Sequence, residues 1–389
     1  MTQSAVAHSR ETDSARAGSE LGQKIAQGLE NATPDVVILF ASSAHDYDAL
    51  IRAVHRACGP RLLVGCSSAG EFAGEAQATG SVSAVALRAP EMQFSAGIGS
   101  GLRTDVEQAA MEMVGAFRGT RNARFRYHTA LILTDALAGH ADDLIEQLTR
   151  LTSGEYQFFG GGAGDDGKFS ETAVFCGTQV MKDAAVALEI LSDKPLGIGV
   201  RHGWMPASAP MRVTEADGMR LKSLNAAPAA EMLAEHADAT DQRFEHAEPL
   251  PFFLQNVLGI DTGGGYKLRV PLGVEADGGI LCAADIPTGV TAHIMGTTAR
   301  SATEAAVAAA EDAVGQIGTL TPSVALFFDC VATRLRTGAA FADELRGVQD
   351  VLGPAASFAG CNTYGQVVRV EGQFSGFHNC TAIVCVIPD

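Results

Sequence analysis

The sequence predicts an α+β protein in which mixed β-sheets are covered by helices. Strand-length apolar runs alternate with helix-like segments, and one strand–helix–strand–turn–strand unit recurs along the chain. Of the 389 residues, 47% are hydrophobic and 19% are charged, a composition too apolar for a disordered chain. No apolar run approaches the roughly 18 residues that a membrane span needs. We therefore expect a soluble globular protein.

The first unit follows a polar segment, 1–33, which we expect to be a loosely held arm with one amphipathic helix near 20–29. Apolar runs and helical periodicity then alternate, and the later strands show period-two patterning. The predicted elements are a strand at 36–42, a helix at 45–58, a strand at 62–68 and strands at 81–88 and 92–99.

The same unit returns twice, each time with a glycine-rich turn after its second strand. The second copy has a strand at 129–135, a helix at 141–151, a turn at 158–166 and a strand at 184–191. The third copy has a strand at 323–330, a helix at 341–352, a turn at 358–366 and a strand at 379–387. A segment that lacks the repeated pattern lies between these two copies, and an alanine-rich helix at 301–317 precedes the third copy. We expect two domains after the arm, at 34–209 and 210–389.

The charge balance argues against polyanionic partners. Lys and Arg number 28 against 45 Asp and Glu, which gives a net charge of −17, so we expect neither nucleic acid nor an anionic membrane surface as a partner. The N-terminus lacks the apolar region of a secretory signal, and we expect a cytoplasmic protein. The 8 cysteines never form a CxxC pair, which favours reduced thiols over a structural zinc site.

The three turns supply most of the candidate ligand-binding residues. Each combines small residues and glycines, which allow close approach of a ligand, with polar side chains that could orient it. The alternative, left open by the sequence, is that they are strand ends that need glycine. The candidates are Cys66, Ser67, Ser68 and Glu71, then Gly161, Gly162, Asp165 and Asp166, then Asn362, Tyr364, Gln366 and Asn379, together with His202.

Two of the turns contain partial catalytic or cofactor motifs. The sequence GAGDDG at 162–167 fits GxGxxG, but a dinucleotide site needs a helix next, and the following residues read as a strand. The sequence GCSSA at 65–69 approaches the GxSxG elbow, with Ala69 in place of the last glycine. A hydrolase with Ser67 or Cys66 as nucleophile is therefore a minor alternative.

Taken together, these motifs resemble the FIST family of signal-transduction proteins, with paired FIST N and FIST C regions. The resemblance spans nearly the whole chain. Two departures are Gln366, where the family usually has Glu, and Ala226, where it would have Gly. The matching segments are VILFAS (37–42), VGCSSAGE (64–71), FFGGGAGDD (158–166), GVRHGWMP (199–206), LNAAPAAEML (224–233), FDC (328–330), TYGQ (363–366) and FHNCT (377–381).

The resemblance implies a sensory protein without known catalysis that binds a small ligand and regulates a separate signalling partner, such as a histidine kinase or a cyclic-dinucleotide enzyme. A stand-alone subgroup with similar architecture binds haem and senses nitric oxide, so haem b is a candidate cofactor. The absence of CxxCH means that such a haem would be non-covalent. Axial ligation would fall to His378 or His293, with His202 next. The alternatives are a sensor of a small polar metabolite such as an amino acid, and a scaffold in which the turns are purely structural.

Overall fold

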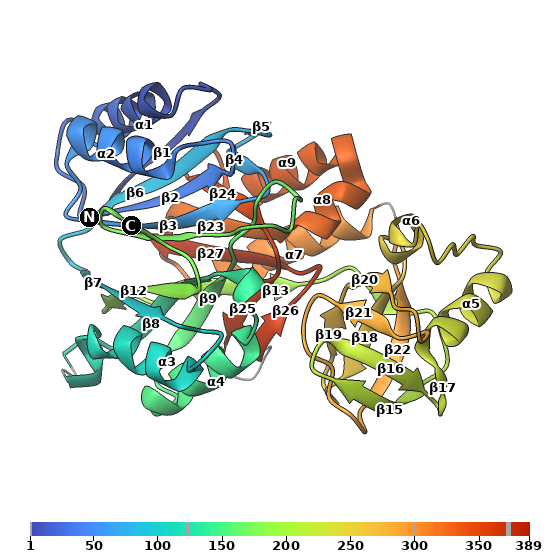
Figure 1. Ribbon diagram of the computed structural model, residues 1–389. Helices are drawn as coiled ribbons and strands as arrows, with labels where there is room; N and C mark the ends of the chain where they lie inside the picture. Colours follow the sequence, from blue (N-terminus) through green and yellow to red (C-terminus); the bar gives the residue numbers. More distant parts are fainter. Residues whose placement is uncertain (1, 122–123, 299, 371–374) are drawn as a thin grey trace.

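A computed structural model describes residues 2–121, 124–298, 300–370 and 375–389. The described residues form mixed sheets covered by helices, which confirms the predicted α+β class (Figure 1). Three sheets have six strands each and share one compact body. A fourth sheet of nine strands forms a separate lobe.

Each six-stranded sheet is built on one recurring unit: strand, helix, strand, helix, strand, hairpin, strand. The second and third strands of a unit are parallel. The last strand pairs antiparallel with the first and second strands. The repeat is therefore longer than the predicted one by a strand and a helix at its start.

The first unit contains β1 (Gln3–Ser9), α1 (Ser14–Gly28), β2 (Val36–Ser42), α2 (Tyr47–Cys58), β3 (Leu62–Ser68), β4 (Glu71–Ala73), β5 (Ala76–Ala78) and β6 (Val82–Arg88). The second contains β7 (Gln93–Ser100), α3 (Val106–Gly115), β8 (Tyr127–Thr134), α4 (Ala141–Leu151), β9 (Gln157–Gly162), β10 (Val174–Cys176), β11 (Gln179–Met181) and β12 (Ala184–Ser192). The third contains β13 (Gly197–Arg201), α7 (Ser301–Gln316), β23 (Pro322–Cys330), α8 (Val331–Thr337), α9 (Phe341–Leu352), β24 (Ser357–Thr363), β25 (Gln366–Arg369), β26 (Ser375–His378) and β27 (Ala382–Pro388). Short 3-10 turns lie at Gly119–Arg121, Ala136–Ala138 and Gly338–Ala340.

The hairpin of each unit joins a neighbouring sheet rather than its own. The β4–β5 hairpin pairs with β24 of the third unit, β10–β11 with β3 of the first, and β25–β26 with β9 of the second. The exchange is cyclic, so every six-stranded sheet contains four strands of one unit and two of another. The three glycine-rich turns are the points where the chain crosses between sheets.

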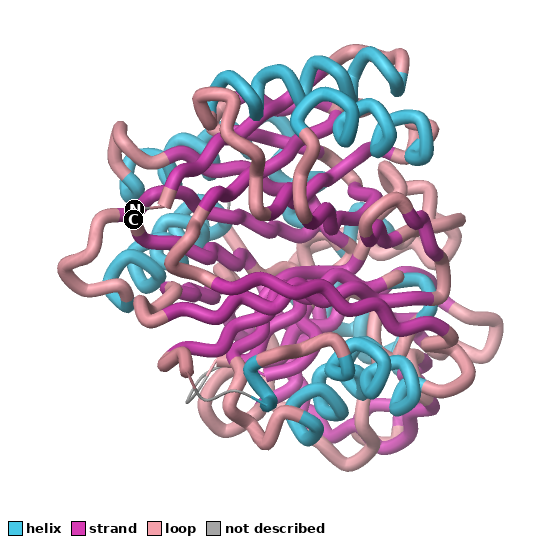
Figure 2. Tube along the Cα trace, turned by 90° about the vertical axis from the view of Figure 1, so that its left-hand side faces the viewer, coloured by secondary structure: helices cyan, strands magenta, loops and turns pink. Residues whose placement is uncertain are grey.

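The inner faces of the three sheets enclose a common core, and the helices cover their outer faces (Figure 2). Phe328 of β23 packs edge-on against Phe40 of β2, with ring centroids 5.5 Å apart, and lies 6.3 Å from Phe159 of β9. One aromatic ring thus contacts all three units. The central strands are buried on both faces, which explains their near-continuous apolar sequences.

The nine-stranded lobe is inserted between β13 and α7 of the third unit and projects to one side of the body (Figure 1). It has its own apolar core. Its elements are β14 (Met205–Pro206), β15 (Met211–Asp217), β16 (Arg220–Leu224), β17 (Ala227–Pro228), α5 (Ala229–Ala239), α6 (Leu250–Phe253), β18 (Val257–Asp261), β19 (Tyr266–Arg269), β20 (Pro271–Val274), β21 (Ile280–Cys282) and β22 (Thr291–Gly296).

Two further expectations differ from the structure. The segment 1–33 is not a loose arm, because β1 is paired along its whole length with β6 and α1 packs on α2 through Gly18 and Gly22. Its buried positions are mostly alanine and glycine, so it reads as polar. The strand expected at 92–99 is β7, which opens the second sheet instead of ending the first.

Gly199 offers a test of the close packing of α7 on β13. A Cβ atom at Gly199 of β13 would lie 1.8 Å from the carbonyl oxygen of Ala309 on α7. At Gly315, which also lies on α7, no atom lies within 4 Å of an added Cβ. We expect Gly199→Ala to lower the free energy of unfolding by about 2–3 kcal/mol through overpacking. Gly315→Ala, the control, should raise it by about 0.5–1 kcal/mol through helix propensity. Equilibrium unfolding in urea measures both, and equal effects would contradict the packing.

Candidate functional site

The three predicted turns meet where the sheets exchange their hairpins, and backbone hydrogen bonds join them in pairs. These bonds run from the N–H of Gly164 to the carbonyl of Ser67 (2.9 Å), from Ala69 to Asn362 (2.9 Å) and from Gly162 to Gly365 (2.8 Å). The turns predicted from separate parts of the sequence therefore lie together. Their side chains decide whether a ligand could enter.

In the first turn the polar side chains bond to one another. The Ser68 hydroxyl donates to one carboxyl oxygen of Glu71 (2.6 Å), and the amide and hydroxyl of Ser81 donate to the other (3.2 and 2.8 Å). Glu71 is fully buried, and burial raises its pKa to about 7. Ser67 accepts a hydrogen bond from the amide of Ala173 (2.9 Å). This turn is a closed polar network.

Ser67 and Cys66 are fully buried within β3, and the chain continues into the strand β4 rather than a helix. An exposed nucleophile on a strand-to-helix turn is what the GxSxG elbow requires. The geometry of a nucleophile elbow is thus missing from this turn. The GxGxxG-like segment at 162–167 also leads to a strand, β10, as its sequence predicted.

The two aspartates of the second turn tie the units together. Asp165 accepts hydrogen bonds from the backbone amides of residues 169, 170 and 171 (2.7–2.9 Å) and from the hydroxyl of Tyr364. Burial opposes ionisation of Asp165, but these hydrogen bonds outweigh it and lower its pKa. Asp166 accepts from Ser42 and Ser43 (2.6–2.9 Å). Gly161 and Gly162 leave no room for a Cβ beside Thr363 and Ala136.

The third turn is also occupied by internal bonds. The Gln366 amide group donates to Thr363 (2.8 Å) and its oxygen accepts from the amide of Thr381 (3.3 Å). Arg334 donates to the side-chain oxygen of Asn362 (2.7 Å). Asn379, outside the turn, accepts from the amide of Val270 in the inserted lobe, 3.2 Å away. The turns thus act mainly as crossing points between sheets.

One cavity reaches the second turn from outside. It has a volume of about 410 Å³ and lies at the start of α2, with Asp165 on its wall. The lining residues are Ser43, His45, Asp46, Tyr47, Asp48, Asp165, Lys168, Ser170, Glu171 and Val180. Since the Asp165 carboxylate is already engaged by the bonds described above, this cavity has little unused hydrogen-bonding capacity at its base.

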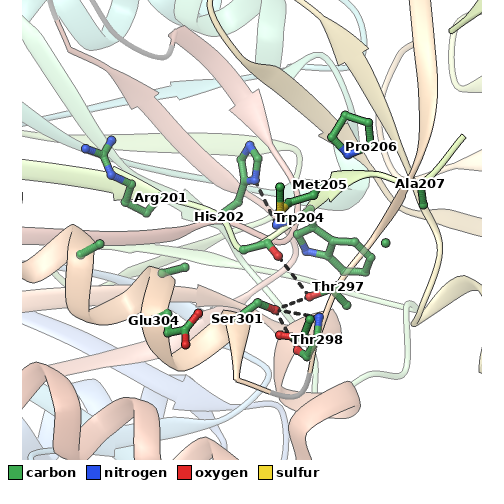
Figure 3. Close-up of a pocket in the computed structure, with 14 residues that line it drawn as sticks. Arg201, His202, Trp204, Met205, Pro206, Ala207, Thr297, Thr298, Ser301 and Glu304 are labelled. Atoms are coloured by element: carbon green, nitrogen blue, oxygen red, sulfur yellow. Dashed lines mark hydrogen bonds between the residues drawn. The ribbon is translucent and has the colours of Figure 1, made fainter. Parts of the chain in front are cut away.

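A larger cavity, about 540 Å³, lies where the inserted lobe joins the body (Figure 3). None of its lining residues belongs to the three turns. Its walls come from the outgoing linker after β13, the returning segment after β22 and the first turns of α7. We call it the linker cavity; it is lined by Arg201, His202, Gly203, Trp204, Met205, Pro206, Ala207, Gly296, Thr297, Thr298, Ser301, Glu304, Ala305 and Ala308.

One hydrogen bond joins the outgoing and returning segments at the linker cavity, and others order each segment. The hydroxyl of Thr297 donates to the carbonyl of Gly203 (3.2 Å), and the amide of Thr298 donates to the hydroxyl of Ser301 (3.2 Å) (Figure 3). His202 Nδ1 accepts from the amide of Trp204 (3.3 Å), and burial lowers the pKa of His202, which keeps the ring neutral. The wall combines apolar surface with a few fixed polar groups, as small-molecule sites do.

The sequence identified only part of this cavity. His202 was a candidate, but Trp204 and the α7 residues were not, because nothing in the sequence shows that residues some 100 positions apart meet across an insertion. The HGWMP segment, with the only tryptophan of the chain next to a glycine, is the signal that marks it.

The other two candidate haem ligands lie away from both cavities. His378 is almost completely buried, and burial lowers its pKa to about 3. His293 places Nδ1 3.1 Å from the carbonyl of Ser208 and packs edge-on against Tyr266. Neither histidine lines either of the two cavities described above. Over the described ranges, no cluster of three or more His, Cys, Asp or Glu side chains could hold a metal ion.

Comparisons with known proteins show the class of this protein. The chain consists of sensory domains that are generally regarded as binding small ligands in signal transduction. The FIST N domain matches residues 35–227, and the FIST C domain matches residues 229–369. The chain therefore belongs to the FIST family, which is not a known enzyme family. A search of curated proteins finds no match.

Among solved structures, one similar chain is described as "Structure of PurLQS from Thermotoga maritima". It is 7% identical, with a TM-score of 0.24, and the match covers 100% of this chain and 73% of that one. Similarity at this level supports no functional argument. None of the described helices has the length and apolar character needed to cross a membrane.

The buried carboxyl group of Glu71 predicts a pH-dependent stability. Its pKa is higher in the folded than in the unfolded chain, so the folded state binds more protons and stability falls as pH rises from about 4.5 through about 7. Glu71→Gln, which keeps an acceptor for Ser81, should abolish this pH-dependent part of the free energy of unfolding, which is on the order of 3 kcal/mol. Urea unfolding at pH 5 and pH 8 measures it. Identical pH dependence in the two proteins would contradict the assignment.

Proposed function

We propose that the protein is a sensor that binds a small ligand in the linker cavity and transmits occupancy through the inserted lobe. The observation that carries this proposal is that the cavity wall is formed by both connections between the lobe and the body, 201–207 and 296–298. A ligand held there contacts both connections at once. The preferred position of the lobe then depends on occupancy, provided that the ligand binds the two positions with unequal affinity.

The lobe has a second contact with the body, which supplies a pivot. Arg269, almost fully buried on β19, donates to the carboxylate of Asp142 on α4 (2.7 Å) and to the carbonyl of Phe377 (2.9 Å). Lys267 pairs with the same carboxylate. A buried pair of this kind is directional and costly to break. Small movements at the linker cavity would therefore rotate the lobe about this contact rather than release it.

The lining of the linker cavity favours a small ligand with an apolar part and a polar head. Trp204, Met205 and Ala305 offer apolar surface, while Arg201 and Glu304 are charged. This fits a small polar metabolite such as an amino acid better than haem. A haem-bound nitric-oxide sensor remains the second candidate, with His202 as the one proposed axial histidine that lines the cavity. A hydrolase at Ser67 or Cys66 has no support, because both side chains are sealed in β3.

The output is proposed to reach a separate signalling protein in the cytoplasm, such as a histidine kinase or a cyclic-dinucleotide enzyme. The support is the family alone, whose members are regarded as signalling domains. We expect such a partner to bind the lobe, because the lobe is the part whose position depends on ligand occupancy of the linker cavity.

A filled cavity tests the proposed site. Ala308→Phe places a ring in the linker cavity, and Glu311→Phe adds an equal ring on an exposed position of the same helix. In a thermal-shift screen of metabolites, we expect compounds that raise the melting temperature of the wild type and of Glu311→Phe to lose at least tenfold in affinity for Ala308→Phe. Compounds that stabilise all three proteins equally would show that the ligand binds elsewhere.

An absorption spectrum tests the haem alternative. We expect the protein purified with haem available to show no Soret band, because His378 and His293 line neither the linker cavity nor the cavity at the start of α2. A Soret band that shifts with nitric oxide and disappears in His202→Ala would replace the metabolite with haem in the linker cavity. The same band lost in His378→Ala would overturn the proposed site altogether.

A further inference from the structure

Two carboxyl groups are buried beneath the linker cavity without hydrogen-bond partners. Asp329, at the end of β23, and Glu344, on α9, are each 1% exposed. Among the described residues, Oδ2 of Asp329 and both carboxyl oxygens of Glu344 have no donor in full hydrogen-bond geometry, although Thr337 and the Asp329 carboxyl lie close enough to Glu344 to act on its pKa. Buried polar atoms are almost always hydrogen-bonded, so these three unpaired acceptors, with the unpaired Nε of Arg336 beside the same void, indicate that a polar group is missing from this place.

The three oxygens belong to side chains that line a small void of about 10 Å³. That is about the space of one water-sized group. The void lies next to the linker cavity, because Arg201, Gly203, Trp204 and Ala305 line both. The missing group is thus small and must donate to the unpaired oxygens. It could be one end of a ligand that is held in the larger cavity.

The charges at the void indicate that the missing group is a cation. Arg336 lines the void, with its guanidinium 5.6 Å from the ring centroid of Trp204, and it donates to the carbonyl of Thr298 (3.2 Å). Of the other arginines nearby, Arg201 is paired with Asp312 (2.7 Å) and Arg334 is engaged by Asn362. Two carboxyl groups therefore face one guanidinium, so a second positive charge is needed for neutrality once the proton that the pair holds at neutral pH is lost.

We propose that the void is the head-group subsite of the ligand and takes a primary ammonium group. An R–NH₃⁺ group has three N–H donors and one positive charge, which match the three unpaired oxygens and the unbalanced carboxylate. The apolar remainder of the ligand would extend past Trp204 into the linker cavity. Ca²⁺ or Mg²⁺ fits less well, because each prefers at least six oxygen ligands and two side chains supply few of them. The inference rests on the proposed ligand function of that cavity.

Proton release should accompany binding. Without a ligand, burial and the neighbouring carboxyl raise the pKa of Asp329 well above its usual value, and burial raises that of Glu344 to about 7, so the pair holds a proton at neutral pH. The ammonium would replace that proton. The other titratable or charged groups around the pair are Arg201 on β13, Cys330 at the end of β23, Arg334 and Arg336 on α8, and Cys380 after β26; α7 contributes only alanines to the void.

Titration calorimetry of the full chain with n-butylammonium chloride, at constant ionic strength, tests the proposal. Between pH 5 and pH 6 we expect the affinity to rise close to tenfold, with about one proton released per amine bound. n-Butanol, of the same shape without charge, and tetramethylammonium, a cation without N–H donors, should each bind at least tenfold more weakly. Potassium chloride serves as the inorganic comparison, and stronger binding of potassium than of butylammonium would overturn the ammonium assignment.

Variants locate the binding. Glu344→Gln should weaken butylammonium at least tenfold and remove most of the pH dependence, whereas Asp343→Asn, a neighbouring exposed position, should leave both unchanged. Because Glu344→Gln removes a buried acid, its melting temperature above pH 7 should equal or exceed that of the wild type, which shows that the variant folds. Asp329→Asn is the second variant, with the same expected loss.

Equal binding of butylammonium by Glu344→Gln and Asp343→Asn would overturn the subsite. That result is distinct from a failure of the proposed function. If the screen finds ligands that Ala308→Phe excludes but none carries an amine, the linker cavity is supported as the ligand site and the ammonium subsite is contradicted. If Ala308→Phe excludes no ligand, the linker cavity itself falls.

Discussion

The exchange of hairpins among the three sheets is the constraint on which the rest of the structure depends. No unit can complete its six-stranded sheet without a neighbour, and each crossing forces a turn into the space where the sheets converge. Backbone groups in that space are shielded from water, so each needs a partner within the protein. Polar residues in the turns supply those partners: Glu71 for Ser81, Asp165 for the loop after it, and Gln366 for Thr381. Their polarity, which resembles that of a ligand site, is a requirement of folding.

The third unit differs from the other two because the lobe is inserted into it, and this asymmetry creates the proposed site. At the end of β2, Ser42 donates to Asp166, and after β8, Asp135 accepts from Thr172 and the amide of Asp183. At the matching end of β23, Oδ2 of Asp329 has no donor among the described residues. The insertion also separates β13 from α7, and the two linkers leave the cavity between them. An incomplete polar network thus adjoins an opening to solvent, an arrangement that suits ligand-dependent signalling.

Local sequence patterns predicted the elements well and their long-range partners poorly. The helices Ala141–Leu151 and Phe341–Leu352 lie where a period of 3.6 put them, and the strand Val36–Ser42 lies where a continuous apolar run put it, because each pattern follows directly from burial. The α+β class and the threefold recurrence followed from the same patterns. The exchange of hairpins did not, since β4 pairs with a strand almost 300 residues away. For the same reason the turns were predicted as a ligand site, whereas the linker cavity depends on contacts that only the fold brings together.

Hydrogen exchange measured by mass spectrometry, with and without saturating n-butylammonium, tests most directly whether the ligand binds at the linkers or at the turns. The proposed linker cavity predicts slower exchange at 203–207 and 301–308, and unchanged exchange at the turns 65–71, 160–166 and 360–366. Protection of the three turns with no change at the linkers would contradict the account, because the signal would then arise at the sheet crossings and not at the connections to the lobe.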